Sequence, residues 1–217
     1  MEIEEHFTEI ICLFFKRYPF RIYKPGEIIL SPLNIAPTLF YIDKGVVSLY
    51  TIQLNGERFL INWASNTTIF PLFWGLADIQ SPYYYEAKTV VSVFRVPKKE
   101  FLIFLHTHTD CLFFLMRKML PETQLLSQRI ELLIASSISD KLQFFLLNLS
   151  RSFGKKQKNG NIIIEFELGH TEIASWIHST RESVTREITK LKKRRIIKMK
   201  DRQITICDIN FLKEKFI

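Results

Sequence analysis

The sequence GHTEIASWIHSTRESVTREITKL, at residues 169–191, predicts two short helices joined by a tight turn. Apolar residues recur at helical spacing in both segments: Ile173, Ala174 and Ile177 in the first, and Val184, Ile188 and Leu191 in the second. Thr180 precedes the second segment, where its hydroxyl can accept a hydrogen bond from a free backbone N–H group. The pattern therefore predicts a helical hairpin with one buried face.

The opposite face of the second helix is polar and carries Glu182, Arg186, Thr189 and Lys193, with Arg181 beside it in the first turn. Arginine can bind O6 and N7 of guanine through two hydrogen bonds, and glutamate can accept from N4 of cytosine. Such a helix suits the DNA major groove. This stretch alone also allows an ordinary helical hairpin with a solvated charged face.

The positive charge of the 217-residue chain is confined to the half that contains this hairpin. Residues 136–217 hold 17 Lys and Arg against 9 Asp and Glu, a net of +8, whereas residues 1–135 hold 13 of each. This distribution is typical of a polyanion-binding module joined to a neutral one. A role at a membrane surface would need a basic amphipathic helix with exposed aromatic residues, which the sequence does not show.

Composition argues against a secreted, disulfide-bonded, zinc-binding or membrane protein. The three cysteines are scattered, which indicates a reducing compartment without a disulfide framework or zinc site. The N-terminus lacks the form of a signal peptide, and charged residues interrupt the most apolar window, residues 101–120. We therefore expect a cytoplasmic protein with no membrane partner, no metal site and no cofactor.

Residues 1–108 predict a helix at 1–18, then short β-type runs, then a short helix near 98–105. Asn55-Gly56 separates two of these runs and predicts a type I′ hairpin turn, which needs positive φ at both positions. Short strands at this spacing, ending with residues 89–97, favour a small antiparallel barrel or sandwich.

Residues 109–135 predict one long helix with a heptad pattern. Its seam, which we expect to form a two-stranded coiled coil between two copies of the chain, consists of Leu112, Met116, Met119, Thr123, Leu126, Ile130 and Leu133. Burial of the stripe in the chain's own core is the alternative. Pro121 lies off the seam and predicts a kink, because it removes a backbone hydrogen bond.

Residues 136–217 begin with a predicted hinge at Ser136-Ser137, where Ser137 and Asp140 form a capping-box-like helix start. That helix is expected to end at Gly154, and a loop then leads to a strand at 162–166. After the helical hairpin, a basic β-hairpin with its turn near Asp201-Arg202 completes a winged-helix arrangement.

Several motifs follow one another along the chain: KPGE (24–27), DKGVV (43–47), NG (55–56), EAKT (86–89), the long helix, the hinge helix KLQFFLLNL, and EIA followed by STRESVTR. In this order and spacing, they resemble the motifs of CRP/FNR-type transcription regulators over nearly the whole chain. The resemblance implies an α+β fold with three parts. These are an antiparallel, jelly-roll-like β-roll sensor domain (1–108), a dimerisation helix (109–135) and a winged helix-turn-helix domain (136–217).

The resemblance also implies double-stranded DNA, a second copy of the chain and RNA polymerase as partners. Base recognition transfers to Arg181, Glu182, Ser183 and Arg186. Phosphate contacts are expected at His170, Thr180, Thr189, Lys193 and Arg202. The chain departs from the family pattern at Gly169, where a capping Thr is usual, and at His178, where the turn usually has Gly and needs a left-handed backbone.

The sensor half departs further from the cyclic-nucleotide-binding members of the family. Pro71-Leu72 and Ser81-Pro82 fall where those members carry a Gly-Glu pair for the ribose and an Arg-Ser or Arg-Thr pair for the phosphate, and a phosphate needs a cation and N–H donors. The expected pocket is aromatic: Phe70, Phe73, Trp74, Tyr83 and Tyr85, with Trp63 and Tyr84 nearby. Either these rings fill the barrel and no ligand binds, or they line a site for an apolar or aromatic effector.

Other classes are disfavoured. The oxygen-sensing branch of the family needs clustered cysteines, and His106 and His108 are expected to be solvated. Cupin-type metal enzymes need several histidines on adjacent strands, yet no histidine lies between Arg21 and Lys99. We therefore expect no catalytic residues. A dimeric interaction module that does not bind DNA would leave the positive charge beyond residue 136 unexplained.

Overall fold

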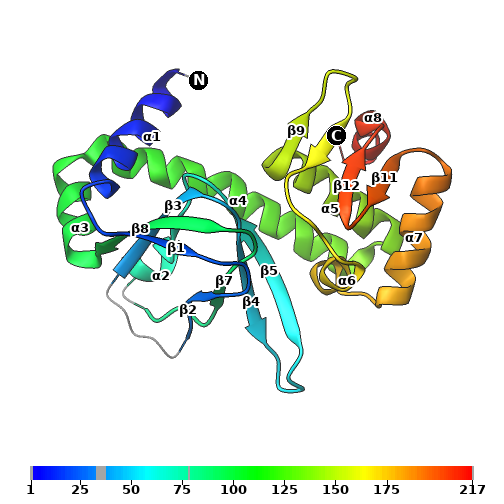
Figure 1. Cartoon of the computed structure of the whole chain (residues 1–217), viewed down its shortest axis with the longest axis horizontal. Helices are drawn as coiled ribbons and strands as arrows, with labels where there is room; N and C mark the ends of the chain where they lie inside the picture. Colours follow the sequence, from blue (N-terminus) through cyan, green and yellow to red (C-terminus); the bar gives the residue numbers. More distant parts are fainter. Residues whose placement is uncertain (1, 33–37, 78, 217) are drawn as a thin grey trace. The chain divides into compact units, whose positions relative to one another are not determined.

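A computed structural model describes residues 2–32, 38–77 and 79–216, and the chain divides into two compact units (Figure 1). Unit 1 comprises Met1–Leu125 and unit 2 comprises Leu126–Ile217. Helix α4, Thr109–Ala135, has the predicted bounds and contains Pro121 without a break in its helical assignment. The kink at Pro121 remains a prediction.

Unit 1 contains two four-stranded antiparallel sheets, which confirms the predicted β-roll. One has the order β1 (Phe20–Tyr23), β8 (Val91–Pro97), β3 (Thr38–Lys44), β6 (Ile69–Phe70). The other has the order β2 (Ile28–Leu30), β7 (Tyr84–Ala87), β4 (Val47–Ile52), β5 (Arg58–Ala64). The helices of this unit are α1 (Glu2–Phe15), α2 (Leu72–Leu76), α3 (Lys98–Thr107) and the first part of α4.

Alternation along β3 explains how one strand serves two cores. Phe40 and Ile42 belong to a cluster of buried residues drawn from both sheets, whereas Leu39 and Tyr41 pack with α1 and α3. Successive side chains of a strand point to opposite faces, so a strand buried on both faces is apolar throughout. The sheet is therefore covered by the helices on one face and by the second sheet on the other.

The β4–β5 hairpin forms where Asn55-Gly56 predicted it, but its turn type differs. Among the described residues of this loop, Gly56 has a positive φ of 82° and Asn55 does not. Gly56 N–H donates to the Gln53 carbonyl at 2.9 Å, and Gln53 N–H donates to the Glu57 carbonyl at 2.9 Å. The type I′ prediction is wrong because a three-residue loop ending in a left-handed glycine satisfies the same sequence signal.

Unit 2 has the predicted winged-helix order. After α4 it contains α5 (Ile138–Phe153), β9 (Gly154–Lys156), β10 (Ile162–Ile164), α6 (His170–Ile177), α7 (Arg181–Lys193), β11 (Ile197–Lys200), β12 (Gln203–Ile206) and α8 (Ile209–Lys213). Its sheet has the order β11-β12-β10-β9. Ser137 Oγ accepts from Asp140 N–H at 3.2 Å, which confirms the helix start. The wing turn has positive φ at Asp201 (48°) and Arg202 (65°).

One part of unit 2 differs from the prediction. Residues 154–156, expected as a helix end and loop, form strand β9, which pairs with β10. Gly154 has an extended backbone (φ −92°, ψ 127°) rather than the left-handed one expected of a helix-ending glycine. The chain thus passes from α5 directly into a strand.

Close packing explains the glycine at this junction and gives a prediction. A Cβ atom at Gly154 would lie 2.2 Å from the Ser150 carbonyl oxygen and 2.4 Å from Cγ2 of Ile162. We expect Gly154→Ala to lower the free energy of unfolding by about 1–3 kcal/mol. Lys155→Ala, at an exposed neighbour, should change it by less than about 0.5 kcal/mol. Urea denaturation compares the two, and equal stabilities would contradict this account of the junction.

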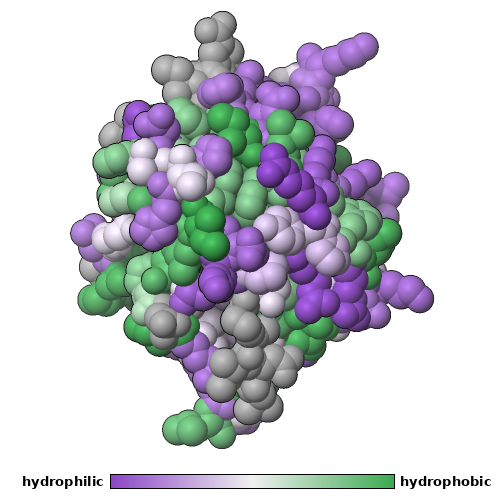
Figure 2. All heavy atoms as spheres, turned by 90° about the vertical axis from the view of Figure 1, so that its left-hand side faces the viewer, coloured by the Kyte–Doolittle hydropathy of each residue, from purple (hydrophilic) through white to green (hydrophobic). Residues whose placement is uncertain are grey.

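The face that carries α1 and α3 is mixed in character, with hydrophobic and hydrophilic residues interspersed (Figure 2). Its exposed apolar side chains include Leu13 of α1, Phe20 of β1 and Ile103 of α3. Across the described part of the chain, every helix is too short or too polar to cross a bilayer.

Candidate DNA-binding interface

Helices α6 and α7 form the predicted helix-turn-helix. Ile173, Ala174 and Ile177 of α6 and Val184, Ile188 and Leu191 of α7 are all buried. His178 lies between the helices with φ 52° and ψ 63°, which confirms the left-handed backbone expected there. At the start of α6, Gly169 N–H donates to Glu172 Oε2 at 3.0 Å. Glu172 thus provides a side-chain contact at a helix start whose N-cap residue, Gly169, has no side chain.

The start of α7 is ordered by hydroxyl groups. Thr180 Oγ1 accepts from Ser183 N–H at 3.2 Å, as predicted for an N-cap, and donates to Ser183 Oγ at 3.0 Å. Ser183 Oγ also accepts from Arg186 Nη2 at 2.9 Å. The Arg186 guanidinium is therefore held by a short chain of hydrogen bonds that begins at the cap of its own helix.

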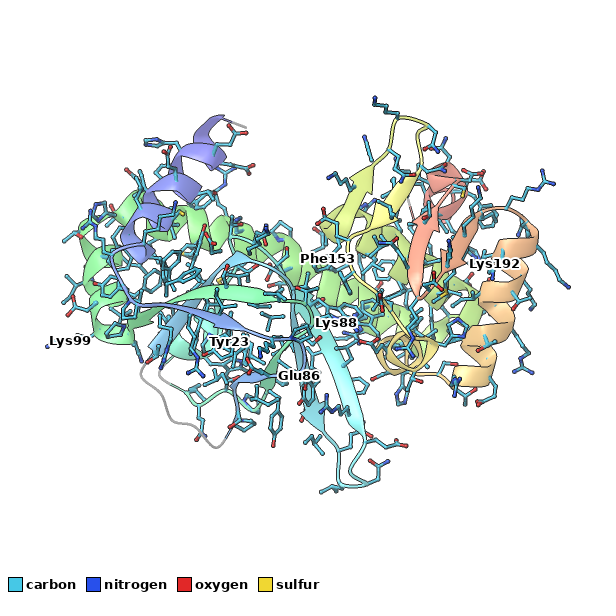
Figure 3. All side chains as sticks on the ribbon, in the orientation of Figure 1. Tyr23, Glu86, Lys88, Lys99, Phe153 and Lys192 are labelled. Atoms are coloured by element: carbon cyan, nitrogen blue, oxygen red, sulfur yellow. The ribbon has the colours of Figure 1, made fainter. Side chains whose placement is uncertain are left out.

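The predicted base-recognition residues lie together on the outer side of α7. Arg181, Glu182 and Arg186 are exposed and Ser183 is half-buried. Thr189 and Lys193 continue the exposed face toward the end of the helix, where the side chain of Lys192 is also exposed (Figure 3). The same helix thus has a fully buried apolar face and a polar face that is free to meet a groove.

His170 and Thr189 are placed differently from simple phosphate donors. His170 Nδ1 lies 2.7 Å from Thr185 Oγ1, and that hydroxyl donates to the Arg181 carbonyl at 2.8 Å. Burial lowers the pKa of His170 below its ordinary value, and the charges of Arg181 and Lys192 lower it further. The Thr189 hydroxyl donates to the Thr185 carbonyl at 2.7 Å. His170 thus tends to be neutral, and the Thr189 proton already has an acceptor.

Arg202 lies at the turn of the wing and is exposed. Its backbone carbonyl accepts from Leu168 N–H at 2.9 Å, just before α6 begins. The wing turn and the start of the helix-turn-helix therefore lie at the same end of the unit 2 sheet. This arrangement brings Arg202 to the end of unit 2 at which the first helix of the pair starts.

Sequence reasoning assigned Lys193 at the end of α7 but gave no role to Lys190 or Arg194. Lys190 pairs with Glu187 at 2.6 Å, and the Arg194 guanidinium lies 4.4 Å from the centre of the Phe211 ring. The basic residues at 190 and 192–195 were visible as charge, but the contact with Phe211 joins parts of the chain that are distant in sequence.

The five predicted pocket residues fall into two groups. Phe70 and Tyr85 are buried between the sheets, where Phe70 stacks on Phe40 at 5.1 Å and on Tyr85 at 4.8 Å between ring centres. Trp74 and Tyr83 make an edge contact at 5.9 Å. The fifth, Phe73 of α2, is 58% exposed and makes an edge contact with Trp74 at 5.3 Å. The rings thus divide into a buried pair and a less buried set of three, of which Tyr83 packs against the core of the sheets.

Pro71-Leu72 and Ser81-Pro82 are predicted to occupy the positions at which the cyclic-nucleotide-binding members carry their ribose and phosphate pairs. Pro71 precedes α2 and Leu72 is its first residue. Ser81 is buried, with its hydroxyl 3.3 Å from that of Tyr85. Burial raises the pKa of Tyr85 to about 12, so its hydroxyl stays protonated. Neither position supplies a cation.

The predicted seam of α4 is partly exposed. Met116, Leu126 and Ile130 are 52–54% exposed, as a surface for another chain requires. Thr123 is exposed, Met119 and Leu133 are half-buried, and Leu112 packs against the core of unit 1. Other exposed apolar side chains of the helix are Phe113, Leu120 and Ile134. The exposed stripe is therefore turned slightly from the predicted one.

Comparison with known families shows that each half of the chain matches a different domain family. Residues 20–108 match the cyclic nucleotide-binding domain family, and residues 140–215 match the Crp-like helix-turn-helix domain family. The chain is a CRP/FNR-type transcription regulator. Among the described residues of this regulator, no three His, Cys, Asp or Glu side chains are grouped in a way that suits a metal ion.

Known members of this type are similar over most of their length. The global nitrogen regulator of Synechococcus elongatus is 26% identical over 196 residues, which are 89% of this chain and 88% of that protein. That of a Nostoc species is 26% identical over 186 residues, 85% of this chain and 83% of that protein.

Solved structures show the same fold. FixK2 from Bradyrhizobium japonicum has a TM-score of 0.76 at 18% identity and covers 89% of this chain and 94% of its own. A CooA mutant from Carboxydothermus hydrogenoformans has a TM-score of 0.74 at 21% identity, with 93% and 88% covered. A CRP/FNR-family transcriptional regulator from Thermus thermophilus has a TM-score of 0.66 at 23% identity, with 90% and 97% covered.

Proposed function

We propose that this regulator acts as a homodimer that binds a palindromic operator and recognises bases through Arg181, Glu182, Ser183 and Arg186. The observation that carries the proposal is the outer face of α7. There the Arg186 guanidinium is held by Ser183 while the opposite face is buried. A side chain that is already ordered loses less conformational entropy when it binds a base edge. Arginine bound to guanine through two hydrogen bonds is the commonest specific contact in the major groove.

The exposed stripe on α4 supports the dimer. Half-exposed Met116, Leu126 and Ile130 would be covered by the same stripe of a second chain, in an interface that is self-complementary about a two-fold axis. Two copies of α7 related by that axis would enter successive major grooves, about 34 Å apart. DNA, a second copy of the chain and RNA polymerase are the partners that this function requires. We propose no catalytic activity.

The test is a selection from random DNA duplexes. We expect the enriched sequences to share two inverted half-sites whose centres lie about one helical turn apart, with a G·C pair inside each half. Enrichment of single, unpaired sites would contradict dimeric binding, and no enrichment at all would contradict sequence-specific binding.

The sensor pocket is proposed to lack cyclic nucleotide binding. Pro71-Leu72 and Ser81-Pro82 offer no cation for a cyclic phosphate, and Phe70 and Tyr85 occupy the space between the sheets. A response to an apolar or aromatic effector is the second candidate. It is favoured by the contacts that the Trp74 ring makes with Tyr83 and with the exposed ring of Phe73, at the edge of the core.

Cyclic AMP therefore gives a direct test of the pocket. Titration calorimetry with the full chain should show no binding in the submicromolar range, because phosphate binding needs charge-assisted donors. Submicromolar binding would place the phosphate site elsewhere in unit 1 and overturn the assignment of these positions.

A further inference from the structure

Arg129 is a buried cation in the last turns of α4. Only 7% of its surface is exposed. Its Nη2 donates to the Trp176 carbonyl at 2.7 Å, and its guanidinium carbon lies 4.0 Å from the centre of the Trp176 ring. Burial lowers the pKa of Arg129 to about 10, so the side chain keeps its charge at neutral pH. A charge is costly to bury unless it is well paired, so this contact is a specific feature of unit 2.

Trp176 lies in the last turn of α6, beside the turn of the helix-turn-helix. The last four carbonyls of a helix lack partners within the helix, and a cation is favoured at that end by the helix dipole. Arg129 supplies both a donor and a charge to this end of α6. The Trp176 ring also lies 5.0 Å from the Phe145 ring and 6.4 Å from the Phe144 ring of α5. Trp176 is thus held by α4 and α5 together.

A second cation connects α5 to α4. Lys141 Nζ of α5 donates to the Leu133 carbonyl at 2.9 Å, near the end of α4. Lys141 is only eight residues from Leu133 and joins neighbouring helices, whereas Arg129 and Trp176 are 47 residues apart. The Arg129 contact therefore joins the dimerisation helix directly to the helix-turn-helix.

We propose that Arg129 is a positioning residue for DNA binding, which fixes the orientation of α6 and α7 relative to the end of α4. This inference rests on the proposed function, because it concerns how two recognition helices reach one operator. Binding of a second half-site depends on the effective concentration set by the joint between the two binding modules. A looser joint would leave contacts with one half-site intact and weaken simultaneous binding of both.

The test compares the Arg129→Met variant of the full chain with the wild type on two duplexes of equal length. One duplex contains the selected palindrome and the other contains a single half-site. Methionine keeps an unbranched apolar stem but loses the donor and the charge. We expect half-site affinity to stay within about twofold, while palindrome affinity falls at least about tenfold and tolerance for altered half-site spacing increases. Gln128→Met, at the exposed neighbour on α4, is the matched control and should change neither affinity.

Arg129→Lys provides the second variant, because its ammonium group can donate to the Trp176 carbonyl while it lacks the planar group that stacks on the ring. Its affinity for the palindrome should lie between that of the wild type and that of Arg129→Met. If Arg129→Met fails to fold, the affinities of Arg129→Lys for the two duplexes test the proposal in its place. Equal losses on both duplexes, or no loss on either, would overturn the positioning role. Failure of the wild-type chain to prefer the palindrome would instead contradict the proposed function.

Discussion

Arg186→Ala should reduce operator binding by about 5- to 150-fold for each half-site, because a good contact between arginine and guanine contributes roughly 1–3 kcal/mol. The substitution removes the guanidinium and leaves Val184 and Ile188 on the buried face of α7 unchanged. We therefore expect an unchanged melting temperature. Fluorescence anisotropy on the selected operator and on variants at each base pair should show that discrimination is lost at one base pair per half-site.

Lys193→Ala is the matched control, because Lys193 is an exposed cation near the end of the same helix. If it contacts only phosphate, its loss should weaken binding to all sequences alike and reduce the slope of affinity against salt concentration. Unchanged affinity and sequence preference in Arg186→Ala would show that another face of α7 meets the DNA.

Replacing Leu126 and Ile130 together with lysine should convert the dimer to a monomer. Both side chains are 52% exposed in the single chain, and two buried lysines facing two more across a two-fold axis would be strongly unfavourable. Light scattering at micromolar concentration should give the 25.7 kDa mass of one chain, against twice that mass for the wild type. Palindrome affinity should fall by about 100-fold or more, since the two half-sites would then be bound independently.

Ile103→Lys is the control for this experiment. Ile103 is 49% exposed and lies on α3, outside the proposed interface. The variant should remain a dimer with wild-type affinity for the palindrome. A wild-type chain that is already monomeric at micromolar concentration would contradict the dimer, as would a double variant that stays dimeric.

The helix-turn-helix could be predicted from sequence because its signals are local. The apolar spacing in α6 and α7 and the cap at Thr180 each involve residues within one or two turns of each other. The same is true of the cap at Ser137, which begins α5. These interactions need no knowledge of the rest of the fold. The left-handed backbone at His178 was instead implied by the resemblance to the family, whose members usually have glycine in that turn.

The register of the exposed stripe on α4 could not be fixed in this way. Two apolar stripes are interleaved along the helix: one contains Leu112 and Met119, and the other contains Phe113 and Leu120. Periodicity cannot decide which of them packs on the chain's own core. The structure packs half-buried Leu112 against the core of unit 1 and leaves Phe113 exposed. The position of the other helices, which is not local information, settles the choice.

The role of Arg129 was similarly hidden. In the sequence it is one more charged residue between seam positions, and its partner Trp176 is 47 residues away. Strand β9 was missed because Lys155 and Lys156 have the composition of a loop, and only pairing with β10 makes them a strand. Both cases depend on contacts that form only when the chain is folded.

Methylation interference on the selected operator tests the central claim, that α7 recognises guanine in the major groove, most directly. Methyl groups at N7 of guanine lie in the major groove, whereas those at N3 of adenine lie in the minor groove. We predict interference from N7 methylation at one guanine in each half-site, and no interference at that position when Arg186→Ala replaces the wild-type chain. Interference from adenine N3 methylation alone, or an N7 pattern that Arg186→Ala leaves unchanged, would contradict this account.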